Sequence, residues 1–180
     1  MINKLKLLLK HLWLDASDAQ RAIPPEVMER LTKRVAASES RHTGQVRICV
    51  EAALPMSYLW RLESRPGRSN ALSQLIRQRA LMMFGKLRVW DTEHNNGVLV
   101  YLQLAEQAIE IVADRGLSQH VSESQWQAMV ARMRTNFQQR LFEDGLTQAL
   151  EEVSALLVAY FPVTANGQRV DELPNEPMVQ

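Results

Sequence analysis

The sequence predicts an α/β fold built from packed layers. Segments with the 3.6-residue apolar period of a helix alternate along the chain with segments that have the period of two typical of strands. Two apolar runs, at residues 98–102 and 109–113, are separated by a short polar turn and predict a β-hairpin. A length of 180 residues with 46% hydrophobic residues suits one domain with a sizeable core.

Composition and charge exclude several classes of protein. The net charge is +1, so charge gives no indication of a nucleic-acid partner. The single cysteine, Cys49, excludes an internal disulfide and a cysteine-rich metal site, and we expect it to be a buried, unreactive thiol. No apolar run approaches the roughly 20 residues that a membrane-spanning helix requires.

The N-terminal segment, residues 1–20, is expected to form an amphipathic helix outside the main domain. Its first fourteen residues carry three lysines and no acidic residue. Lys10 and His11 interrupt the apolar stretch, and no small-residue cleavage site follows, so the segment does not fit a secretory signal. The helix either packs on its own domain, which we favour, or uses residues 1–14 to lie on a membrane surface or a partner. We therefore expect a cytoplasmic protein, membrane-associated in the second case.

Residues 21–163 carry the patterns of the main domain. Pro24-Pro25 is expected to open a helix that Thr43-Gly44 ends. Apolar and other residues then alternate over residues 46–50 and predict a strand. A basic connection at residues 60–69 is interpreted as a solvated loop, with an anion-binding patch as the alternative. Its arginines are Arg61, Arg65 and Arg68.

The remaining helices are indicated by apolar stripes and caps. One runs from Leu72 to Leu87 and leads to the hairpin. Ser122 begins a capping box at the start of the next, and the last extends from Leu146 to Tyr160. Residues 164–180 lack periodicity and predict an extended or disordered tail.

The order of the strands predicts where polar residues gather. The connection from the first strand to residues 98–102 contains a helix, which predicts a right-handed parallel crossover. Both strands then begin at the same end of the sheet, where their antiparallel partner finishes. Loops 39–44, 91–96 and 114–116 should therefore converge. Their polar side chains are Glu39, Arg41, His42, Asp91, Glu93, His94, Asn95, Asn96, Asp114 and Arg115.

Such a cluster suits a hard divalent cation, calcium or magnesium, because these ions prefer carboxylate and amide oxygens. A bound cation could polarise a phosphoryl oxygen, with Arg115 neutralising charge and His42 or His94 supplying a proton. Zinc is disfavoured because no His/Cys pair has ligand spacing. Walker, nucleophile-elbow, paired Asp-x-Asp and dinucleotide motifs are absent from the sequence.

Each part of this cluster also has a purely structural interpretation. Asn96-Gly97 is a common turn dipeptide, across which residues 87–90 could pair as a hairpin with the strand that follows. Asp114 and Arg115 could form a local ion pair. Asp91 and Glu93 could be solvated loop residues.

Five segments in order resemble the TPM domain: residues 90–101, residues 110–117, Trp126, residues 137–146 and residues 160–162. That family includes a thylakoid-lumen acid phosphatase, a photosystem II repair factor and a nematode receptor modulator. The resemblance covers roughly residues 26–162. It implies a three-layer αβα sandwich on a small mixed β-sheet. It also implies the phosphatase activity and calcium binding described for some members, with family motifs at Asn96-Gly97 and Asp114-Arg115-Gly116.

The sequence departs from the family pattern at its ends. Many members carry an Asp-rich segment before the first helix, a signal peptide and a C-terminal anchor. Here only Asp15 and Asp18 precede Pro24, and no signal or anchor is recognised, so we expect a compact, soluble branch.

Two functions are therefore expected. The first is a metal-assisted phosphomonoester hydrolase that acts on a phosphorylated substrate. The alternative is a non-catalytic interaction module that binds a protein partner and assists a membrane-associated or multiprotein complex. For the hydrolase, the expected catalytic residues are Asp114, Arg115 and His42. The expected ligands of calcium or magnesium are Asp91, Glu93, Asn95, Asn96 and Asp114.

Overall fold

The computed structural model describes residues 2–63, 71–163 and 171–180. Its four-stranded sheet has the order β3-β2-β1-β4. The strands are β1 (Gln45–Glu51), β2 (Gly97–Gln103), β3 (Ala108–Ala113) and β4 (Met178–Val179). β1 runs parallel to β2, and β3 runs antiparallel to β2, so the predicted crossover and hairpin are confirmed.

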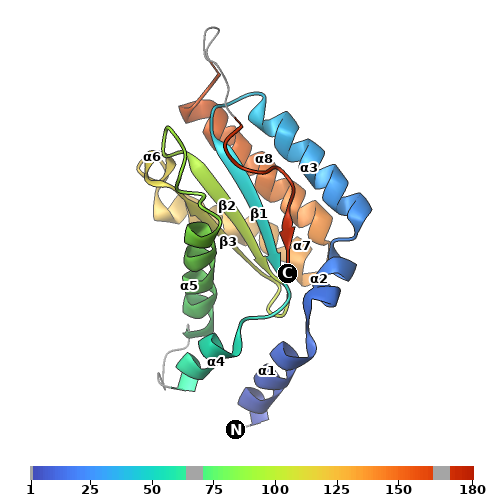
Figure 1. Ribbon diagram of the computed structural model, residues 1–180. Coiled ribbons are helices and arrows are strands. Elements are labelled where there is room, and N and C mark those ends of the chain that lie inside the picture. The colour runs from blue at the N-terminus through green and yellow to red at the C-terminus, as the bar shows by residue number, and fades with distance from the viewer. Residues whose placement is uncertain (1, 64–70, 164–170) are drawn as a thin grey trace.

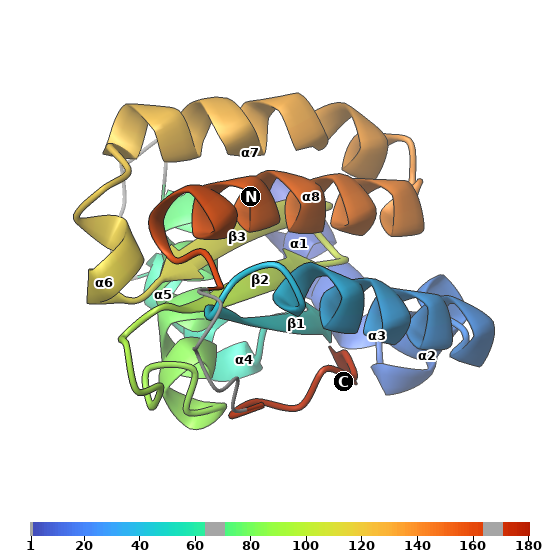
Figure 2. The same cartoon turned by 90° about the horizontal axis from the view of Figure 1, so that it is seen from above.

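Helices cover both faces of the sheet, as Figure 2 shows from above. One face packs against α3 (Pro25–Glu39), α7 (Glu123–Gln138) and α8 (Phe142–Tyr160). The other packs against α4 (Met56–Glu63) and α5 (Ala71–Lys86). The predicted three-layer αβα sandwich is therefore confirmed. β2 is buried along its whole length because apolar layers cover both of its faces.

The sequence predicted several helix boundaries well and others poorly. Ser122 caps α7 in a capping box with Gln125, as expected. α3 begins at Pro25 but ends at Glu39, before the expected stop at Thr43-Gly44, and His42 beyond it turns into the core. Residues 87–90 form turns, so the alternative hairpin across Asn96-Gly97 was wrong.

The N-terminal segment forms two helices, α1 (Ile2–Trp13) and α2 (Ala16–Ala22). Asp15 divides them because its side chain caps α2. Leu12 and Trp13 of α1 are 60% and 81% exposed, so a membrane or partner surface at residues 1–14 stays a prediction. Within the described parts of the chain, no helix has the length and apolarity needed to cross a bilayer.

The C-terminal residues add a strand that the sequence did not predict. Residues 171–180 run along the sheet and end in β4, in which Met178 and Val179 pair with β1 in parallel (Figure 1). A two-residue strand is too short to show a period of two. The side chains of residues 61–70, including the three arginines of the predicted basic loop, lie outside the described part of the structure.

A buried ionic group lies between β1 and α5. Arg79 forms an ion pair with Glu51, and the hydroxyl of Tyr101 donates to Glu51 over 2.5 Å. Gln180 reaches the same carboxylate over 3.2 Å, which ties the C-terminus to the core. Burial raises the pKa of the nearby Cys49 thiol to about 12, so the expected unreactive thiol is consistent with its surroundings.

Candidate functional site at one end of the sheet

Three loops converge at one end of the sheet because of the strand register. Gln45 pairs with Gly97 at the start of β1 and β2, and Val98 pairs with Ala113 at the end of β3. The amide of Asp114 extends this ladder by donating to the Gly97 carbonyl over 2.9 Å. The loops that precede β1 and β2 therefore lie beside the residues that follow β3.

Loops 91–96 and 114–116 are joined by direct hydrogen bonds. The Gly116 amide donates to the Asn95 carbonyl over 2.8 Å, and the Arg115 Nε donates to Asn95 Oδ1 over 3.0 Å. Asn95 adopts a positive φ of 51°, which asparagine tolerates better than most residues. A Cβ atom at Gly116 would lie 2.4 Å from the Asn95 carbonyl oxygen, so this close approach requires glycine.

Asn96 is fully buried and is held by two threonines. Its amide N–H donates to Thr92 Oγ1 over 3.1 Å, and its Nδ2 donates to Thr43 Oγ1 over 3.3 Å. Its Oδ1 is buried and accepts no hydrogen bond from any residue that the structure describes. Neither threonine was predicted as part of the site. The spacing of Thr92 four residues before Asn96 was the available signal for one of them.

Asp114 occupies the N-cap of the short helix α6 (Arg115–Ser118). Its Oδ1 accepts from the Arg115 amide over 2.7 Å. The residue as a whole is partly exposed, yet its Oδ2 is covered by the protein and has no donor within the described ranges. In the described part of the chain, this end of the sheet therefore contains two covered oxygens without a donor, one from Asn96 and one from Asp114. An unsatisfied buried acceptor costs about 1–3 kcal/mol, so both oxygens are suited to a ligand.

His42, predicted as catalytic, lies inside the fold. It is fully buried, its Nε2 lies 2.9 Å from Ser38 Oγ and its Nδ1 lies 3.0 Å from the Gly44 carbonyl. The carbonyl can only accept, so Nδ1 carries the proton and Nε2 accepts from the serine hydroxyl. Glu39 is also buried and accepts from the Val46 amide over 2.8 Å. These contacts fix the start of β1.

The charged side chains of loop 91–96 point away from this buried part. Asp91 is exposed and forms an ion pair with Arg88. Glu93 and His94 are exposed, and the Glu93 amide donates to Glu172 of the C-terminal segment over 2.8 Å. Across the residues that the structure describes, no three His, Cys, Asp or Glu side chains are grouped to hold a metal ion. The covered oxygens without a donor among the described residues of this end belong to Asn96 and Asp114.

Comparison with known proteins agrees with this architecture. The NMR structure of BA42 protein from the psychrophilic bacterium Bizionia argentinensis sp. nov. superposes with a TM-score of 0.67 at 23% sequence identity. The match covers 87% of this chain and 94% of that one, and it concerns the fold. No curated protein matches the chain. The model of the TPM domain family matches residues 16–156, which include the whole of the candidate site. The chain therefore belongs to the TPM domain family.

Proposed function

We propose that this chain is a metal-assisted phosphomonoesterase that binds calcium or magnesium at the end of its sheet. The observation that supports this proposal is the pair of covered, unsatisfied oxygens, Asn96 Oδ1 and Asp114 Oδ2. An amide oxygen and a carboxylate oxygen are ligands that hard divalent cations prefer. A cation that both oxygens reach would satisfy the two acceptors, which no donor within the described residues does.

The residues of this end have different roles in the proposal. Asn96 and Asp114 would hold the cation, with Asn95 supplying a further oxygen from the adjoining loop. Asp91 and Glu93, which were expected as ligands, are exposed and point away from the covered oxygens, so they have no role in the proposal. A bound cation would neutralise charge on a phosphoryl oxygen.

Arg115 would bind and orient the phosphate. Its Nε is held by Asn95, while its terminal nitrogens donate to no other described residue. A guanidinium anchored in this way can donate two hydrogen bonds to a phosphate. We assign no catalytic proton transfer to His42, because both of its ring nitrogens already have partners inside the fold.

Hydrolysis of a generic aryl phosphate tests the proposal. Rates should be measured across pH with calcium, magnesium, manganese or a chelator. Asp114→Asn keeps an Oδ1 acceptor for the α6 cap but removes the negative charge, and it should lower the metal-dependent rate on the order of 10–100-fold. Asp144→Asn, an exposed acid in the first turn of α8, is the matched control and should keep the rate.

Two results would contradict the enzymatic proposal: no metal-dependent hydrolysis by the unmodified chain, or an unchanged rate in Asp114→Asn. Cation binding without hydrolysis would favour the alternative of a non-catalytic interaction module, which stays a prediction.

A further inference from the structure

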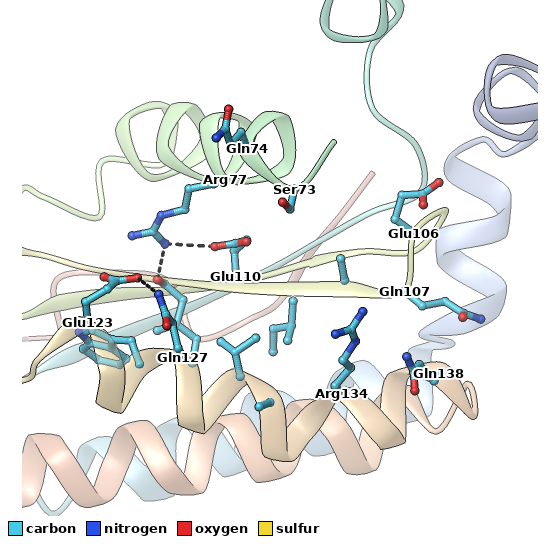
Figure 3. A pocket seen from close by; sticks show the side chains of 16 residues that line it. Ser73, Gln74, Arg77, Glu106, Gln107, Glu110, Glu123, Gln127, Arg134 and Gln138 are labelled. Carbon is cyan, nitrogen blue, oxygen red and sulfur yellow. Dashed lines mark hydrogen bonds and ion pairs between the residues drawn. The ribbon is translucent and has the colours of Figure 1, made fainter. Parts of the chain in front are cut away.

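A groove of about 660 Å³ runs along β3, away from the candidate cation site (Figure 3). α5 forms one wall and α7 forms the other. The α5 wall carries Arg77, the α7 wall carries Trp126, Val130 and Arg134, and Glu110 projects from β3 between them. The floor is the open edge of the sheet, because β3 is an edge strand.

The backbone of this edge has hydrogen-bonding groups available. The Asp114 amide donates to β2, and in an antiparallel pair every second residue of a strand forms hydrogen bonds to the partner strand. Ile109, Ile111 and Ala113 therefore direct their backbone N–H and C=O groups away from β2. Arg77 Nη1 donates to the Ile111 carbonyl over 2.6 Å, which agrees with this direction. The amides of these three residues donate to no other residue in the described ranges.

Some charged side chains along the groove form ion pairs, and others do not. Arg77 pairs with Glu110 over 3.3 Å, and Glu106 pairs with Lys10 over 3.2 Å. Burial raises the pKa of Glu110, and Arg77 offsets part of this effect. Arg134 has no acidic partner among the described residues, and Figure 3 shows it reaching from α7 toward β3 near Gln107. Among the described residues that line the groove, Arg134 is therefore an unpaired cation at the Gln107 end, and Glu123 is an acid without a cationic partner.

The α7 wall also has an apolar stretch. Trp126 and Val130 are partly buried, and with Arg134 they follow a spacing of four residues along one face of α7. They pack against the same apolar core as Ile109 and Ile111. An extended chain that pairs with Ile109 and Ile111 would direct alternate side chains toward this wall. Two apolar side chains of the added chain would contact Trp126 and Val130. The next side chain on the same face of that chain would contact Arg134.

We propose that this groove binds an extended segment of a partner protein, which adds to β3 as a fifth, antiparallel strand. The partner segment has two apolar side chains and then an acidic one at alternate positions, all facing α7. Backbone hydrogen bonds to Ile109, Ile111 and Ala113 supply affinity, and Arg134 selects the acidic residue. Arg77 also shields one carbonyl of the edge, as charged residues on edge strands commonly do, but it leaves the three amide donors available.

A synthetic peptide tests this inference on the full chain. The probe is Thr-Val-Thr-Val-Thr-Asp-Thr, blocked at both ends and titrated into 15N-labelled protein at up to millimolar concentration. We expect the largest amide shifts at residues 107–113 and along α7. Replacing the aspartate of the probe by lysine should weaken binding about threefold to tenfold.

Two matched pairs make the test specific. Arg134→Glu should weaken binding of the probe about tenfold, whereas Arg132→Glu on the same helix, whose partner Glu152 lies on α8, should leave it unchanged. N-methylation of the valines and the aspartate removes the amides that would face β3 and should abolish binding. N-methylation of the threonines alters amides that would face solvent and should be tolerated.

The inference is overturned if the probe causes no shift along β3, or if both methylated peptides bind equally. Shifts that depend on Arg134 but survive both methylations would indicate a site for a small anion and would also overturn it. None of these outcomes bears on Asp114 or on phosphate hydrolysis, so this test is independent of the proposed function.

Discussion

The glycines at the candidate site show how single residues determine its shape. Gly97 begins β2, and a Cβ atom there would lie 1.9 Å from the Val89 carbonyl oxygen. The backbone of the preceding turn therefore packs directly against the start of the strand, at the position next to Asn96. By contrast, a Cβ atom at Gly85 in α5 would have no neighbour within 4 Å.

These two glycines provide a matched stability test. Gly97→Ala forces two backbone segments apart and should lower the free energy of unfolding by about 1–3 kcal/mol. Gly85→Ala lies in a helix with open space around it and should raise the free energy by about 0.5–1 kcal/mol. Urea unfolding of the two variants measures both effects. A Gly97→Ala variant as stable as the unmodified chain would show that this close approach is absent in solution.

The site residues divide according to what local sequence can predict. Asn96 and Asp114 flank strands, so topology alone brought them to one end of the sheet. The environment of His42 could not be predicted in this way. Its burial depends on contacts with Ser38 and with the loop to β1, which are set by how α3 and α8 pack. The unsatisfied oxygens are likewise a property of packing, which a sequence pattern does not record.

At the scale of elements, a buried polar side chain, His11, anchors α1 to the rest of the domain. His11 is 5% exposed, and its Nδ1 accepts from the Leu54 amide over 3.0 Å. Its Nε2 lies 3.3 Å from Glu106 Oε1. Burial alone would raise the pKa of Glu106, but His11 and Lys10 together lower it below its usual value. These contacts support the interpretation that α1 packs on its own domain.

Removal of this anchor should loosen α1. His11→Ala leaves the buried Leu54 amide without an acceptor, and we expect a loss of about 1–3 kcal/mol in unfolding free energy with faster hydrogen exchange in α1. Lys10→Ala removes only a half-exposed ion pair with Glu106 and should change stability by less than about 1 kcal/mol. Hydrogen exchange of α1 that is identical in His11→Ala and the unmodified chain would rule out the anchor.

At the scale of the whole molecule, the layers and the relative directions of β1, β2 and β3 could be predicted, because they follow from periodicity and from the hand of a crossover. α4 and β4 could not be predicted from the sequence. α4 has eight residues, and its second half, residues 60–63, falls in the segment that was interpreted as a loop; β4 has two residues. β4 is held by long-range contacts, including the bond from Gln180 to the buried Glu51–Arg79 pair. Contacts between distant segments of this kind leave no local pattern.

The central claim is that Asn96 and Asp114 form a cation site, and a calcium titration of the 15N-labelled chain tests it most directly. We predict saturable amide shifts at residues 94–97 and 114–117, which Asp114→Asn abolishes and Asp144→Asn preserves. A parallel titration with magnesium compares the two ions. The claim is contradicted if neither ion shifts these amides at millimolar concentration, or if the shifts persist unchanged in Asp114→Asn.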